Sequence, residues 1–158
     1  MKSLKVSTYI QLVLLVLLVL LFWTTISIAD KVNTEAVPAQ VVAITSSTFS
    51  PGEISHNTLR AIFIMRYAKW SDGTPVKVYV YDDSSPIHQL FSKEVLHFFP
   101  RQLRQAWDRQ VFSGLGQYPQ QVDSVEEMLI KVKTTPGSVG YVKIQEITTD
   151  VHILQIQP

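Results

Sequence analysis

The chain has 158 residues, no cysteine and a formal net charge of +1. This length is typical of a single domain. A charge so close to zero excludes the broad positive surface that attracts nucleic acid, so we expect no nucleic-acid partner. Because no disulfide can form, a hydrophobic core must hold the fold together, and a domain of this size buries enough apolar surface to do so.

The N-terminal residues have the pattern of a secretory signal. Lys2 and Lys5 precede an unbroken apolar run from Leu12 to Trp23, and the small residue Ala29 stands at a suitable cleavage position. A short basic region, an apolar core and small residues before the cleavage site are the parts of a signal peptide. The sequence therefore predicts a signal over 1–29.

An uncleaved membrane anchor is the alternative. The stretch 10–28 contains 19 residues, close to the roughly 20 that a bilayer-spanning helix needs. In either case the rest of the chain is predicted to be exported, and a bacterial periplasm fits best. It consists of a polar tether over 30–38 and a domain over 39–158. Without 1–29, which holds two lysines, 12 basic and 13 acidic residues are left.

Strands alternate with helices along the predicted domain. Strands are indicated by β-branched runs and by alternation with period two, and helices by apolar residues at helical spacing between capping residues and Pro or Gly. The order favours an α/β fold with a mostly parallel sheet and an antiparallel edge. The predicted strands cover 39–44, 76–81, 139–144 and 151–156, and the predicted helices cover 55–65, 87–98, 101–111 and the segment from 125 to the turn at 134–138.

The stretch YDDSSPIHQLF, residues 81–91, joins a predicted strand to a predicted helix. Ser84, Ser85 and Pro86 stand where the helix begins. The first N–H groups of a helix are unpaired and carry partial positive charge, so they can hold an anion. Serine is also a preferred N-cap, and proline is favoured at the next position. The residues alone therefore allow either an anion site or a simple cap.

Other chemistry finds no support in the sequence. The histidines lack the short spacings of metal ligands, and there is no cysteine to assist them. The chain contains no nucleophile elbow, no phosphate-binding P-loop and no dinucleotide fingerprint. We therefore expect no metal, no cofactor and no enzymatic activity. The histidines are His56, His88, His97 and His152.

A set of residues spread over about 40–145 resembles a known family in order and spacing. A Leu-x-x-Ile-Phe helix leads to a tryptophan, a serine-initiated helix follows, and a Pro-Gly-x-Val-Gly-Tyr element comes late. In these respects the chain resembles the phosphate-binding periplasmic proteins of ABC transporters. The matching residues are Leu59, Ile62, Phe63, Trp70, Phe91, Pro136, Gly137, Val139, Gly140 and Tyr141.

The resemblance implies one lobe of a type II periplasmic binding-protein fold, with a mixed, mostly parallel sheet flanked by helices. Members of the family have two lobes, and this chain has room for one. Their phosphate motif is Arg-x-x-x-Ser-Gly-Thr. Ser85 falls on the motif serine, whereas Tyr81, Pro86 and Ile87 replace the arginine, glycine and threonine. Tyrosine cannot supply the bidentate clamp of arginine.

Two functions are compatible with this resemblance. The first is binding or sensing of phosphate or another small oxyanion, linked to ABC transport, with Tyr81, Ser84, Ser85 and His88 as the ligand-binding residues. His88 would contribute a positive charge only when protonated. The second is an interaction module without a ligand, which forms a homodimer or docks on a membrane sensor or transporter. A lone lobe exposes a face that its missing partner would cover.

Overall fold

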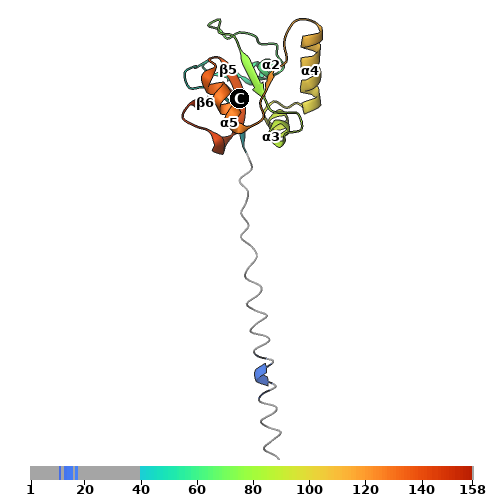
Figure 1. The fold of residues 1–158 in the computed structure, drawn as a ribbon, viewed down its shortest axis with the longest axis vertical. Coiled ribbons are helices and arrows are strands. Elements are labelled where there is room, and N and C mark those ends of the chain that lie inside the picture. Colours follow the sequence, from blue (N-terminus) through green and yellow to red (C-terminus); the bar gives the residue numbers. More distant parts are fainter. Residues whose placement is uncertain (1–10, 12, 16, 18–39, 158) are drawn as a thin grey trace, which may run out of the picture. The chain divides into compact units, whose positions relative to one another are not determined.

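The computed structural model describes residues 11, 13–15, 17 and 40–157 (Figure 1). The chain separates into two units, Met1–Ala36 and Val37–Pro158, and every described strand belongs to the second. The predicted signal or anchor and the predicted tether lie outside the described residues, apart from the helical positions 11, 13–15 and 17. Among the described residues, no helix combines the length and the apolar character that crossing a membrane requires.

The core of the second unit is a five-stranded sheet of order β4-β3-β5-β1-β6. Strand β3 is parallel to β4 and β5, whereas β1 is antiparallel to β5 and β6. A second, parallel pair joins β2 to β7. The predicted mixed and mostly parallel α/β sheet is therefore confirmed. The strands are β1 (Val41–Ser46), β2 (Ile54–Ser55), β3 (Lys77–Val80), β4 (Gln120–Gln121), β5 (Ser138–Lys143), β6 (Val151–Ile153) and β7 (Ile156–Gln157).

Helices cover both faces of this sheet. Helix α5 (Val125–Thr134) packs on one face, where a side chain at Gly140 would collide with Met128 and Val132. On the other face Tyr141 stacks on Phe91 with ring centroids 4.0 Å apart. The side chains of neighbouring β5 residues thus point to opposite faces of the sheet, as they do in any strand. The second layer contains α2 (His56–Phe63), α3 (Pro86–Leu90) and the π-helix η2 (Phe91–Val95).

The predicted helix over 87–98 is shorter than expected and changes its type. It begins at Pro86, and its second half is the π-helix η2, in which the Leu96 N–H donates to the Phe91 carbonyl at 3.1 Å. The helix ends at Val95, and His97 adopts a positive φ of 54°. The prediction was wrong here because apolar spacing does not distinguish a helix from the irregular turn that follows it.

Helix α4 (Pro100–Phe112) agrees with the prediction over 101–111. Figure 1 shows it along one side of the domain, next to the α3 region. Leu103 and Trp107 are its buried residues, and the Trp107 Nε1–H donates to the Phe63 carbonyl at 2.6 Å. The Phe112 side chain is 85% exposed. Two side chains therefore supply most of the attachment of α4 to the core.

Local chemistry decides the caps and the turn after α5. Ser55 and Ser124 cap α2 and α5 through their side chains, and Gly137 has a positive φ of 75°. The predicted strand over 151–156 is instead the two short strands β6 and β7. Strands β2 and β4 have two residues each, too few for a periodic pattern to reveal them.

Candidate functional site

The parallel strands β3, β4 and β5 end at one edge of the sheet. We call this the strand-end edge and define it as 81–85, 122–127 and 143–146, the residues that end or follow these strands. Ligands of open α/β sheets bind outside the carboxyl ends of strands. The predicted stretch 81–91 starts at this edge, which makes it the candidate site.

Ser85 occupies the N-cap of α3 and Pro86 the following position, as predicted. Among the described residues, however, the Ser85 hydroxyl caps no N–H group of the helix. The Ser85 N–H donates to the Asp82 carbonyl at 2.9 Å, which closes a turn before the helix. The capping interpretation is thus correct for the backbone, and the side chain of Ser85 stays available.

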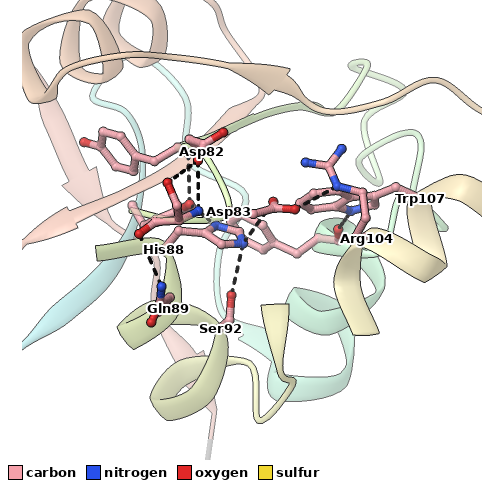
Figure 2. Close-up of polar contacts among 11 residues, drawn as sticks. Asp82, Asp83, His88, Gln89, Ser92, Arg104 and Trp107 are labelled. Carbon is pink, nitrogen blue, oxygen red and sulfur yellow. Dashed lines mark hydrogen bonds and ion pairs between the residues drawn. The ribbon is translucent and has the colours of Figure 1, made fainter. Parts of the chain in front are cut away.

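Asp82 already occupies the position that an anion would need. Its carboxylate Oδ1 accepts the Ser84 N–H at 2.9 Å and the Ser84 hydroxyl at 2.5 Å, as Figure 2 shows. These two bonds lower the pKa of the Asp82 carboxyl, so it is ionised at neutral pH. Pro86 has no N–H to offer. The start of α3 therefore carries an internal carboxylate where a bound phosphate would find its donors.

His88 lies in the core, with 1% of its surface exposed. Its Nδ1 is 2.6 Å from the Tyr141 hydroxyl, and that hydroxyl oxygen accepts the Tyr81 N–H at 3.0 Å. The other ring nitrogen, Nε2, faces Ser92 at 3.4 Å and Asp83 at 3.8 Å. The His88 ring thus contacts buried partners, and its contact with a ligand stays a prediction.

Burial lowers the pKa of the His88 imidazole, against the opposing effect of the Asp83 carboxylate. Unfolded histidine titrates near pH 6.5. Below about that pH the unfolded chain binds a proton that the folded chain resists, so stability should fall as pH falls, by at most about 1.4 kcal/mol per pH unit for one proton. We expect this loss in urea unfolding between about pH 7 and pH 5. A His152→Gln variant, which changes an exposed histidine, should keep this loss of stability at low pH. An NMR titration that gives His88 a pKa at or above about 6.5 would contradict the prediction.

Tyr81 is 5% exposed, and its hydroxyl is buried without a hydrogen-bond partner among the described residues. It follows the last residue of β3, and its ring contacts the Tyr141 ring with centroids 5.4 Å apart. Burial, together with the Glu146 and Glu126 carboxylates, raises the pKa of its phenol.

One ion pair at this site was not foreseen from the sequence. The Arg104 Nε–H of α4 donates to Asp83 Oδ2 at 2.8 Å, and its guanidinium lies 5.0 Å from the Trp107 ring centroid (Figure 2). The hydrogen bond to Asp83 raises the pKa of Arg104. This arginine is therefore engaged and does not replace the arginine of the phosphate motif.

Negative charge prevails along the strand-end edge. Two basic side chains are close to it, Arg104 on Asp83 and Lys143 at the end of β5. A surface of this sign repels a free oxyanion at long range. The carboxylates of the edge are Asp82, Asp83, Asp123, Glu126, Glu127 and Glu146.

Two cavities lie elsewhere. One of about 480 Å³ lies between the loop 49–53 and β6, and one of about 350 Å³ lies between α4 and the segment after α2. None of the predicted residues Tyr81, Ser84, Ser85 and His88 lines either described cavity. Both described cavities therefore lie away from the strand-end edge.

The fold is shared with part of several solved phosphate-transport proteins. The chain is similar to an ABC-type phosphate transport receptor from Vibrio cholerae, with 12% identity and a TM-score of 0.51. It is similar to PstS from Borrelia burgdorferi, with 19% identity and a TM-score of 0.56. It is also similar to a protein from Clostridium perfringens described as a phosphate ABC transporter substrate-binding protein with bound phosphate, with 15% identity and a TM-score of 0.58.

These likenesses cover 73–74% of this chain and 44–47% of the other chains. The chain therefore spans less than half the length of these proteins, in agreement with the predicted single lobe. At such identities the likeness establishes the shared fold. No protein-family model matches the chain, and no curated protein matches it.

Proposed function

We propose that this chain is an exported, non-enzymatic recognition lobe that docks on a partner protein through the strand-end edge. The observation that carries the proposal is the Asp82 carboxylate, which takes both the N–H and the hydroxyl of Ser84. An anion at this place would have to displace an ionised side chain and would meet the other carboxylates of the edge. A partner protein can contact the carboxylates of the edge without needing the N–H and hydroxyl donors of Ser84.

Binding of phosphate or another small oxyanion at Ser84 and Ser85 is the second candidate. It is favoured by the likeness to phosphate receptors of ABC transporters and by the Ser85 side chain, which caps no N–H of the described helix. A single lobe would bury little of such a ligand, and we expect its affinity to be low.

Titration calorimetry with inorganic phosphate separates the two functions. For a docking lobe, we expect no saturable heat from the unmodified chain up to about 1 mM phosphate, since this corresponds to less than about 4 kcal/mol of binding free energy. Asp82→Ala frees two donors and removes a negative charge, so any phosphate binding should be stronger in that variant. Saturable heat in the unmodified chain that Ser85→Ala weakens tenfold or more would overturn docking in favour of oxyanion binding.

Docking itself is tested by photo-crosslinking in cells. A photoreactive residue at Gln145, on the strand-end edge, should give a discrete protein adduct, and one at the exposed Gln105 of α4 should not. Mass spectrometry identifies the partner, including a second copy of this chain. Adducts from Gln105 alone would place the interface elsewhere and contradict the proposal.

A further inference from the structure

We propose that the strand-end edge binds a cationic side chain, the ammonium of a lysine or the guanidinium of an arginine, presented by the partner protein, with Tyr81, Glu126 and Glu146 as the recognition residues. This inference rests on the docking function proposed above. It assigns to the edge a ligand charge opposite to that of the phosphate held by a structural relative.

The first observation is the unpartnered hydroxyl of Tyr81. The side chain is 95% buried, its ring contacts Tyr141 at 5.4 Å between centroids, and its hydroxyl has no partner within the described part of the chain. A buried polar group without a partner is costly and rare, so it calls for an explanation. A donor from outside the chain supplies one once the side chains that cover the hydroxyl move aside, because the phenol oxygen accepts hydrogen bonds from N–H groups.

The second observation is that two carboxylates lie on the elements that neighbour Tyr81 at the strand-end edge. Glu126 lies in the first turn of α5, and Glu146 ends the short helix η3 (Ile144–Glu146) after β5. Both act on the Tyr81 phenol and, with burial, raise its pKa. The parallel pairing of β3 with β5 brings these segments to one edge independently of that effect.

The carboxylates are also held in place. Glu146 Oε2 accepts the Lys143 N–H at 2.9 Å. The Glu126 carboxyl has a lowered pKa because of hydrogen bonds to its own backbone N–H and to Ser124, so it stays ionised. A neutral acceptor between two fixed negative groups matches an ammonium or guanidinium, whose charge-assisted hydrogen bonds are the strong ones. Within the described residues, no group of three metal-ligating side chains is present, which argues against a bare metal ion.

Two cations among the described residues already pair with other carboxylates. Arg104 donates to Asp83, and Lys133 at the far end of α5 pairs with Asp150 at 2.9 Å. Lys143 belongs to the edge, and the described contact with Glu146 comes from its backbone. A cation from a partner therefore completes the arrangement, and the remaining carboxylates of the edge would steer a basic segment toward it.

The test is fluorescence anisotropy with a labelled tri-arginine peptide, at low ionic strength, on the chain as cells produce and process it. We expect saturable binding that weakens as salt rises. Glu146→Gln and Tyr81→Phe should each weaken it about fivefold, as expected for a lost hydrogen bond to a charged partner. Glu94→Gln, an exposed carboxylate on η2, is the matched control and should leave the affinity within about twofold.

Tyr81→Phe carries a second readout. Since the hydroxyl has no partner among the described residues, its removal should not lower the thermal midpoint of the free chain, although it weakens peptide binding. A purely structural role would change the two together. Glu146→Gln, at the edge of the sheet, keeps the test valid if the tyrosine variant folds poorly.

Several results would overturn the inference. One is that the unmodified chain does not bind the peptide, and another is that Glu94→Gln weakens peptide binding as much as Glu146→Gln does. A third is that free spermidine binds more tightly than the peptide and also depends on Glu146, which would indicate a small amine as the ligand. If the peptide does not bind but a residue at Gln145 still crosslinks to a partner, the cationic ligand is contradicted and the docking function is supported. If there is neither peptide binding nor crosslinking, both proposals are contradicted.

Discussion

Replacing Trp107 with alanine is expected to lower the free energy of unfolding by about 3–5 kcal/mol. The indole is fully buried, at 0% exposure, and its removal leaves a cavity that the surrounding core fills only in part. Its Nε1–H donates to the Phe63 carbonyl at 2.6 Å, so the variant also leaves a buried acceptor on α2 without its donor. Because α4 is attached through Leu103 and Trp107, the helix should loosen as well.

The matched control for Trp107 lies on the same helix. Phe112 is also aromatic but is 85% exposed, so Phe112→Ala should change stability by no more than about 0.5 kcal/mol. The measurement is urea unfolding followed by circular dichroism. A loss below about 1 kcal/mol for Trp107→Ala would contradict the view that this side chain attaches α4 to the core. A comparable loss for Phe112→Ala would indicate that α4 has a covering that the described residues do not include.

Much of the fold could be predicted because apolar periodicity and local capping decide it. Leu103 and Trp107, the buried residues of α4, stand four residues apart, and Ser124 is a typical capping residue directly before α5. The alternation over 76–81 located β3. Such signals lie within a few residues of one another, and no knowledge of distant contacts is needed to interpret them.

The interior of α3 could not be predicted in this way. Of the apolar residues that suggested its buried stripe, Phe91 is fully covered, whereas Ile87, Leu90, Val95 and Phe98 are only partly buried. The other fully covered positions of α3 and η2 are His88 and Ser92, and both are polar. A hydrophobicity pattern assigns polar residues to the outside, so it cannot show that Tyr141, 53 residues away, satisfies a buried histidine.

The electrostatics of the site also depended on the fold. Tyr81, Ser84 and Ser85 were correctly assigned to the junction after β3, but the Asp82 carboxylate was not predicted to take the donors of Ser84. The pair of Asp83 with Arg104, 21 residues apart, depends on how α4 packs. The carboxylates Glu126 and Glu146 reach the same edge only through the parallel pairing of the strands. Residue types could indicate the junction, and the charges that surround it required the structure.

The second large effect is expected for Tyr141→Phe, which should lower the free energy of unfolding by about 2–4 kcal/mol. The change removes one oxygen atom and preserves the stacking on Phe91. It leaves two buried groups without a partner: the Tyr81 N–H and His88 Nδ1, which contact the hydroxyl at 3.0 and 2.6 Å. Each unsatisfied buried group costs about 1–3 kcal/mol.

Tyr81→Phe is the natural control for Tyr141→Phe, because it removes the same atom from a neighbouring buried ring. The Tyr81 hydroxyl has no hydrogen-bond partner among the described residues, so its removal should change stability by less than about 0.5 kcal/mol or raise it slightly. Urea unfolding of both variants at neutral pH measures the contrast. If the two tyrosines lose equal stability, hydroxyl bonding does not explain the effect. If only Tyr141→Phe lowers stability, the Tyr141 hydroxyl links β3, β5 and α3 and thereby stabilises the strand-end edge.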